Sequence, residues 1–168
     1  MRTNDIFRKL VQSLPLRSDQ SEQVEQVEQV QALFAASDID LTDKDVNNLL
    51  KTDYQPGFEP MPEYILLILL NNLIDQQRGK VPDAQPHLVE KHHKISNNDV
   101  LKKLRIAFNL HEQDVRDALK LVTIELTKSD LSALFRKPGH ANYKACDDSL
   151  VLDFIEGLGL LLQQRKAG

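Results

Sequence analysis

NDIFRKL at residues 4–10 returns as NDVLKKL at residues 98–104. A second pair of segments matches in the same way, with LTDKDVNNLL at residues 41–50 and LTKSDLSALF at residues 126–135. The second match continues without a gap almost to the end of each half of the chain. Repetition of this kind is the sequence signature of a duplicated structural unit. The chain is therefore predicted to contain two copies of one unit in tandem.

The boundary between the two copies is marked by a change in composition. VPDAQPH at residues 81–87 is rich in turn-forming residues, and the segment continues to residue 94 without a helical pattern. We predict a first repeat at residues 1–80, a linker at residues 81–95 and a second repeat at residues 96–168.

Apolar residues recur at helical spacing in both repeats. The first predicted helix shows this spacing clearly, with apolar side chains at Ile6, Phe7, Leu10, Val11 and Leu14. The sequence shows no convincing alternation of apolar and polar residues, the pattern typical of strands. We predict an all-α fold with about four helices per repeat, packed as a helical bundle with a pseudo-two-fold relation between the repeats.

Several helix boundaries carry their own signals. Thr42 has the character of an N-cap, and Asp45 three residues later completes a capping-box-like pair. Thr127 and Asp130 repeat this device in the second half. The helix that precedes Thr42 is predicted to extend over Ser18–Ala36, because apolar residues continue at helical spacing through its Glu-Gln-Val run.

The last helix of each repeat, starting near Pro62 or Asp148, is apolar on almost every side. A helix of this kind is central, surrounded by other helices. We therefore predict that the two last helices pack against each other or lie in one shared core. Gly157 and Gly159 inside the second copy disfavour a helix by about 1 kcal/mol each, so close approach by a neighbouring backbone is the predicted compensation.

The composition is that of an ordinary soluble globular protein. The chain has 168 residues, of which 41% are hydrophobic and 27% are charged. One cysteine, Cys146, excludes an intramolecular disulfide and a paired-cysteine zinc site. The N-terminus lacks the apolar core of a signal peptide, and the apolar run at residues 65–70 is far shorter than the ~20 residues of a membrane span. We expect a cytoplasmic protein without a membrane partner.

Two segments of the second repeat carry a resemblance to a known family. LKKLRIA at residues 101–107, followed by LSALFRKPGHANY at residues 131–143, resembles the signature of the bacterial YehS-type family of uncharacterised proteins. That family consists of proteins of about this length, built from two copies of a domain of unknown function. The resemblance implies a cytosolic, all-helical bacterial protein, with no established activity and no catalytic residue to carry over. The first half departs from the family pattern in its Glu-Gln-Val segment.

Residue types that bind metals or act as nucleophiles are present but not in the usual patterns. His92, His93, His140 and Cys146 could each hold a metal, yet none forms a tight ligand pair such as C-x-x-C or H-x-x-x-H. Cys146 stands where the first repeat has Met61, which favours a small apolar filler. The sequence has no G-x-S-x-G motif and no glycine-rich phosphate loop. We predict no catalytic residue, no cofactor and no metal.

Charge differs between the two halves of the chain. Residues 1–90 carry 8 Lys and Arg against 15 Asp and Glu, a net charge of −7, whereas residues 91–168 carry 13 against 10, a net charge of +3. The acidic half could attract the basic half of a second copy, or the basic half could face an anionic ligand. The same side chains could also be the solvated faces of their helices. The candidate partner-binding surface comprises Lys102, Lys103, Arg105, Arg136, Lys137, His140 and Tyr143.

Three classes of function stay open on the sequence. The favoured class is a non-enzymatic cytosolic protein-interaction or regulatory module, with an unknown protein or a second copy of the chain as partner. The alternative is nucleic-acid binding through the basic second repeat, with residues 114–136 as a helix-turn-helix-like element. An enzyme with an unrecognised polar pocket is the third class.

Overall fold

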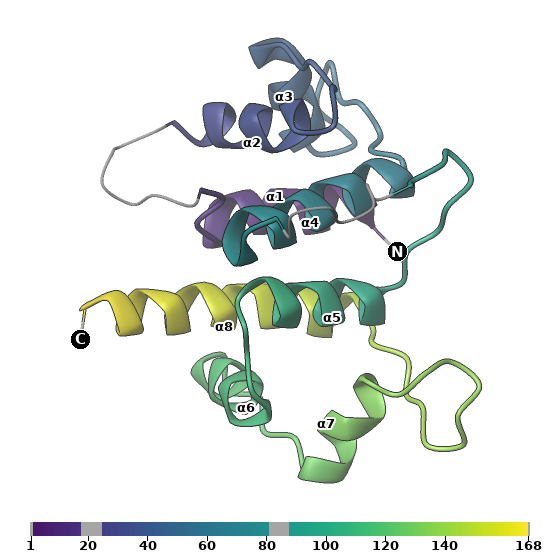
Figure 1. Cartoon of the computed structure of the whole chain (residues 1–168), viewed down its shortest axis with the longest axis vertical. Helices are drawn as coiled ribbons and strands as arrows, with labels where there is room; N and C mark the ends of the chain where they lie inside the picture. Colours follow the sequence, from purple (N-terminus) through teal and green to yellow (C-terminus); the bar gives the residue numbers. More distant parts are fainter. Residues whose placement is uncertain (1, 18–24, 81–87, 168) are drawn as a thin grey trace.

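The computed structural model describes residues 2–17, 25–80 and 88–167. Within these residues the chain forms eight α-helices and no strand, which confirms the predicted all-α fold with four helices per repeat (Figure 1). The helices are α1 (Thr3–Ser13), α2 (Gln26–Ala35), α3 (Asp43–Leu50), α4 (Glu63–Arg78), α5 (Asn97–Ala107), α6 (Glu112–Leu121), α7 (Lys128–Leu134) and α8 (Asp148–Ala167).

The first and last helices of the two repeats form the middle of the molecule. α1 packs against α8, and α4 packs against α5, so each repeat places its first helix on the last helix of the other repeat. The short helices lie outside this centre, with α2 and α3 at one end and α6 and α7 at the other (Figure 1). This reciprocal packing is the pseudo-two-fold relation that the repeated sequence predicts.

One hydrophobic core runs through both repeats. Its largest fully buried side chains include Phe7 and Phe34 from the first repeat and Leu104 and Phe154 from the second. Of the two predicted arrangements for α4 and α8, the shared core is therefore the observed one. Neither repeat closes around a separate core, since the apolar faces of α1 and α5 are covered by the opposite repeat.

The capping signals are confirmed to different degrees. The Asp45 backbone N–H donates to Thr42 Oγ1 at 3.1 Å, and the Thr42 N–H donates to Asp45 Oδ2 at 2.9 Å, which completes a capping box at α3. At α7 the Asp130 N–H donates to Thr127 Oγ1 at 3.0 Å, but the reciprocal bond is missing. The device is thus complete in the first repeat and half complete in the second.

The second helix is shorter than predicted. α2 begins at Gln26 and Glu25 is extended, so the helix does not reach back to Ser18, while residues 18–24 lie outside the described part of the chain. Helices in proteins are held mainly by tertiary packing of an apolar face. The first turn of α2 is largely exposed, and the first fully covered residue is Val30. The described part of the Glu-Gln-Val run, from Glu25 to Gln29, therefore has little cover from the rest of the protein.

Gly157 and Gly159 allow the close approach that was predicted. A Cβ atom at position 157 would lie 2.1 Å from the backbone oxygen of Ala118 in α6. A Cβ atom at position 159 would lie 2.4 Å from the backbone oxygen of Ser13 in α1. Both distances are far inside van der Waals contact, so α6 and α1 rest directly on the backbone of α8.

A buried asparagine in α5 anchors the loop that follows α7. The side-chain amide of Asn98 donates to the backbone oxygens of Leu134 at 2.9 Å and Lys144 at 2.8 Å. Its oxygen accepts from the backbone N–H of Cys146 at 2.9 Å. Three backbone groups at the ends of one loop are thus satisfied by a single side chain. This clamp positions the chain between α7 and α8.

The first repeat contains the same clamp at the equivalent residue, Asn4. Its amide donates to the backbone oxygens of Leu49 at 3.0 Å and Glu59 at 2.9 Å, and its oxygen accepts from the Met61 N–H at 2.8 Å. Cys146 is buried as its counterpart Met61 is, which confirms its predicted role as an apolar filler. The asparagine in each copy of the repeated heptapeptide therefore has a structural role.

Among the helices of the described residues, none combines the length and the apolar character that crossing a bilayer requires.

Candidate functional site

The side chain of Arg105 is fixed on the surface of the second repeat. Its Nε donates to the backbone oxygen of Leu110 at 3.1 Å, and its guanidinium lies over the ring of Phe135, 4.8 Å from the ring centre. Phe135 directly follows α7 and is half-buried. A cation over an aromatic face is attracted by the ring quadrupole. The arrangement holds a positive charge and an apolar ring side by side at the surface.

Two shallow hollows flank the Arg105–Phe135 pair. One, of about 390 Å³, is also lined by Arg78 of α4 together with Lys102 and Ile106 of α5. The other, of about 280 Å³, is also lined by Arg136 and Glu112. Ile106 leaves 48% of its surface exposed, which is high for a large apolar side chain. We call the following residues the Phe135 surface: Arg78, Lys102, Arg105, Ile106, Phe135 and Arg136.

The structure brings together three of the seven candidate residues on the Phe135 surface. These three are Lys102, Arg105 and Arg136. Lys102 and Arg136 are exposed, whereas Arg105 is half-buried against Phe135. Two residues of α5 and one residue just after α7 thus lie around Phe135, and the other four candidate residues do not line these hollows.

Lys103 faces the other repeat instead. Its Nζ donates to Asn71 Oδ1 of α4 at 2.7 Å. Burial lowers the pKa of this ammonium group, while the nearby carboxylate of Asp99 acts in the opposite direction. The equivalent residue of the first repeat, Lys9, lies 3.3 Å from Glu156 of α8. Both lysines thus bridge the junction between the repeats, which explains their recurrence in the heptapeptide.

Tyr143, His140 and Lys137 lie away from the two hollows. The Tyr143 hydroxyl donates to Asn98 Oδ1 at 3.1 Å, so this side chain supports the asparagine clamp. His140 and Lys137 are exposed in the loop after α7, where His140 Nδ1 accepts from the Asn142 N–H at 3.0 Å. The sequence analysis assigned all three residues to one surface with Arg136, because the path of this loop does not follow from the residue pattern.

Sequence reasoning did not select Arg78, Ile106 or Phe135 for this surface. Ile106 carried a usable signal, because it lies about 200° around the helix from the buried Leu104, off the apolar stripe. Phe135 is the counterpart of Leu50 in the first repeat, and an apolar residue at this position of both copies predicts a core side chain. Arg78 belongs to the other repeat and reaches the surface through the packing of α4 on α5. No local sequence pattern predicts this packing.

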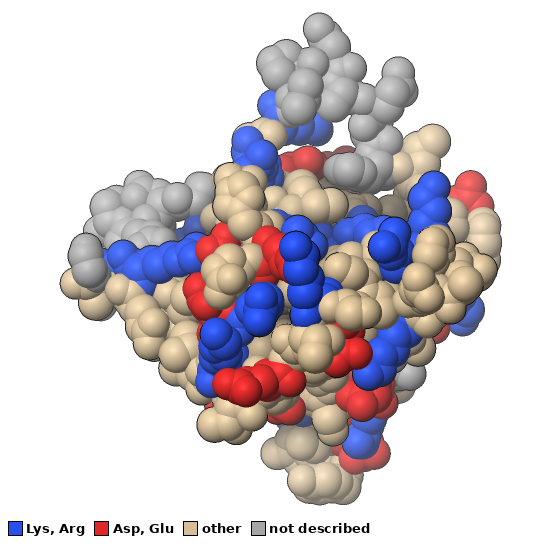
Figure 2. Space-filling model, turned by 90° about the horizontal axis from the view of Figure 1, so that it is seen from below, with Lys and Arg blue, Asp and Glu red and all other residues tan. Residues whose placement is uncertain are grey.

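The proposed helix-turn-helix element takes the form of α6 and α7 joined by residues 122–127. α7 is only seven residues long, about two turns, and is a short candidate for a recognition helix in a major groove. Figure 2 views the molecule from the end where α6 and α7 lie. On this face Lys and Arg side chains alternate with Asp and Glu side chains and form no uniform basic area.

The thiol of Cys146 is expected to be unreactive in this environment. Burial raises the pKa of its thiol from 9.0 to about 12, and the carboxylates of Asp147 and Asp148 add to the shift. A thiol that retains its proton is a poor nucleophile and a poor metal ligand. Within the described ranges, no three or more His, Cys, Asp or Glu side chains cluster as a metal site would require.

The raised pKa of Cys146 predicts an alkaline dependence of stability. Between about pH 9 and about pH 12 the unfolded thiol loses its proton while the folded thiol retains it, so the free energy of unfolding falls as pH rises. We expect wild type to lose up to about 1 kcal/mol more than Cys146→Ala between about pH 8 and pH 10, because solvent screens part of the shift. Urea unfolding of both proteins at each pH measures this difference. Parallel losses in the two proteins would contradict the prediction.

The fold and the clamps together define a tandem-repeat helical protein, made of two copies of one four-helix unit around a shared core. The chain belongs to the family described as "Protein of unknown function (DUF1456)", whose sequence model matches residues 3–79 and 97–165, one segment in each repeat. The resemblance seen in the sequence is confirmed.

A comparison with curated proteins gives the same placement. The chain is 32% identical over 126 residues to "Uncharacterized protein YehS" from Escherichia coli (strain K12), a match that covers 75% of this chain and 80% of the relative. No solved structure matches the chain.

Proposed function

We propose that the protein is a non-enzymatic interaction or regulatory module of the cytosol, which binds an acidic segment of a protein partner on the Phe135 surface. The observation that carries this proposal is the fixed Arg105–Phe135 pair between two hollows. The guanidinium of Arg105 is already oriented, so this side chain loses little conformational entropy when a partner forms a hydrogen bond to it.

The chemistry of the surface favours a protein segment that carries both carboxylates and apolar side chains. Lys102, Arg105 and Arg136 supply positive charge, and Arg78 adds a fourth cation from the first repeat. Exposed Ile106 supplies an apolar contact beside them. Arginine and aromatic residues are enriched in the energetic centres of protein interfaces. Carboxylates would pair with the cations while an apolar side chain of the partner covers Ile106.

Nucleic acid is a poorer match to the same surface. Binding to a phosphate backbone rests on many lysines and arginines that together neutralise a row of phosphates. The mixed charge of the α6–α7 face and the presence of Glu112 in one hollow oppose such a row. A partner with a few well-placed carboxylates tolerates this mixture, because its own cations can pair with the acidic side chains.

The non-enzymatic part of the proposal is supported by what the polar residues already do. The buried asparagines bind backbone groups of their own repeats, and Lys103 bridges the two repeats. Cys146 holds its proton and is enclosed. These side chains are committed to the fold, whereas Lys102 and Arg136 of the Phe135 surface are exposed and can bind a partner.

Charge reversal at adjacent positions tests the proposal. Arg136 lines one of the hollows, whereas Lys137 is equally exposed but does not. A partner is first recovered by affinity purification from the source cell, identified and produced separately, and its affinity is then measured by calorimetry. We expect Arg136→Glu to weaken binding at least about tenfold and Lys137→Glu by less than about threefold, with similar thermal unfolding for both variants.

Two outcomes would count against the proposal. Equal effects of the two substitutions would indicate general attraction to a basic region. Recovery of nucleic acid, with an affinity that falls steeply as salt is added, would favour the alternative function. A short fluorescent DNA duplex, titrated at low and high salt, measures that alternative directly.

A further inference from the structure

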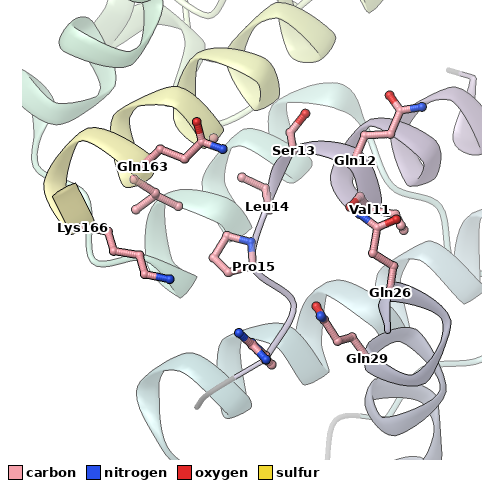
Figure 3. Close-up of a pocket in the computed structure, with 12 residues that line it drawn as sticks. Val11, Gln12, Ser13, Leu14, Pro15, Gln26, Gln29, Gln163 and Lys166 are labelled. Carbon is pink, nitrogen blue, oxygen red and sulfur yellow. Dashed lines mark hydrogen bonds between the residues drawn. The ribbon is translucent and has the colours of Figure 1, made fainter. Parts of the chain in front are cut away.

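A third hollow lies at the junction of the repeats, away from α7. It has a volume of about 270 Å³ and is bordered by the end of α1, the start of α2 and the last turns of α8 (Figure 3). Ligand sites in proteins often lie where two structural units meet, since both contribute side chains to one space. This hollow is of that kind, because α1 and α2 belong to the first repeat and α8 to the second.

The floor of this hollow is apolar and firmly held. Leu14 is buried and Pro15 and Leu162 are half-buried, and all three line it. Gly159 and Ser13 also line the hollow, and α8 rests on α1 at these two residues. A side chain at position 159 would separate these helices, so the glycine fixes the depth of the floor.

The polar lining of the hollow is positive and rich in amides. Among the described residues that line it are two cations, Arg17 and Lys166, and four glutamines, and none of these described residues is Asp or Glu. Figure 3 shows the amino group of Lys166 and the amide of Gln29 on opposite sides, with Leu14 and Pro15 between them.

The four glutamines of the hollow differ in the hydrogen bonds that they make to the described residues. Gln26 donates to the backbone oxygen of Val11 at 3.1 Å, and Gln29 Oε1 accepts from the Leu16 N–H at 3.3 Å, so these two amides are held by α1 and the segment after it. Gln12 and Gln163 are exposed at the edge of the hollow, and their side chains make no hydrogen bond to a described residue. A ligand could therefore gain amide bonds there without breaking existing ones.

The hollow is the pseudo-symmetric counterpart of the one beside Ile106. Gln12 corresponds to Ile106 in the alignment of the repeats, and Gln163 corresponds to Arg78. The same packing of first helix on last helix thus leaves a space in both places, but the lining differs. Amides replace the arginine and the exposed isoleucine, so the two spaces suit ligands of different chemistry.

We propose that this hollow binds a small organic carboxylate with a short apolar body. The carboxylate pairs with the Lys166 ammonium group and accepts from the neighbouring amides, while the body covers Leu14, Pro15 and Leu162. A bare inorganic anion would leave this apolar floor open to water, and a neutral molecule would forgo the charge of Lys166. This site shares no lining residue with the Phe135 surface, so a ligand can be shown to bind one and not the other.

Hexanoate is a suitable probe, with hexanamide as the uncharged analogue and inorganic phosphate as the anion without an apolar body. Each is titrated into the ¹⁵N-labelled full chain and followed by two-dimensional NMR. We expect hexanoate to give saturable shifts at residues that line the hollow, hexanamide and phosphate to bind about tenfold more weakly, and Lys166→Gln to reduce hexanoate affinity about tenfold. Lys120→Gln, a substitution at an exposed lysine of α6, should bind hexanoate as wild type does.

Each contrary result overturns a stated part of the proposal. Absence of saturable shifts with hexanoate removes the site. If hexanamide binds as tightly as hexanoate, or if Lys166→Gln binds hexanoate as wild type does, the site does not recognise a carboxylate. If phosphate binds at the same residues more tightly than hexanoate, the ligand does not need an apolar body. Shifts confined to the Phe135 surface would assign the anion to that surface instead.

Discussion

Replacing Asn98 with alanine is expected to lower the free energy of unfolding by about 3–5 kcal/mol, because the substitution strands three backbone groups at once. The oxygens of Leu134 and Lys144 lose their donor, and the Cys146 N–H loses its acceptor. Asn98 and Cys146 are both buried, so solvent can replace only part of what is lost. Urea unfolding followed by circular dichroism measures the change.

Asn98→Asp separates hydrogen bonding from packing. The carboxylate has nearly the same shape and can still accept from the Cys146 N–H, but it cannot donate to either backbone oxygen. We expect a loss at least as large as that of Asn98→Ala, since a charge would also be buried. Asn142→Ala, at an exposed position in the same loop, should change stability by less than about 0.5 kcal/mol.

Asn4→Ala extends the test to the first repeat, where the same three kinds of bond are made. Because one core joins the repeats, both alanine variants should unfold in a single transition shared by the whole chain. A loss below about 1 kcal/mol in either variant, or two separate transitions, would show that the clamps do not hold the fold as the contacts indicate.

Local features of the fold were accessible from the sequence because they depend on spacing along one helix. The apolar stripe of α1, the Thr42 capping box and the close approaches at Gly157 and Gly159 each depend on short-range pattern or residue type. The pairing of α1 with α8 is different, because it depends on which apolar faces meet after folding. An amphipathic pattern predicts that one face of a helix is covered, but it does not predict which helix covers that face.

The candidate site was predicted in part for the same reason. Arg105 and Arg136 were identified from charge, but charge alone does not say where a side chain points. Successive residues on a helix are about 100° apart, so Lys102 and Lys103 leave α5 in different directions. Lys102 reaches the Phe135 surface while Lys103 reaches Asn71 of the other repeat. Only the packing of the two repeats distinguishes these adjacent lysines.

The glycines of α8 give the second large expected effect. Gly157→Ala should destabilise the protein by about 2–3 kcal/mol, although alanine gains about 1 kcal/mol of helix propensity. The new methyl group would lie 2.1 Å from the Ala118 oxygen, and a backbone oxygen in a helix cannot move aside like a flexible side chain. Gly159→Ala should have a similar effect by forcing α8 away from Ser13 of α1.

Gln164→Ala, at an exposed position of the same helix, is the matched control and should change the free energy of unfolding by less than about 0.5 kcal/mol. If Gly157→Ala and Gly159→Ala instead raise stability by the helix-propensity gain, the helices are farther apart than the structure places them. Thermal and urea unfolding of the three variants against wild type distinguish these results.

The first repeat shows why the glycine at 157 is specific to its partner helix. The equivalent residue is Asn72, whose amide donates to the Leu33 oxygen of α2 at 2.8 Å. Leu33 is the counterpart of Ala118, so the same backbone oxygen meets an amide donor in one repeat and a bare backbone in the other. Gly157→Asn should therefore destabilise more than Gly157→Ala, because the amide that fits between α2 and α4 has no room between α6 and α8.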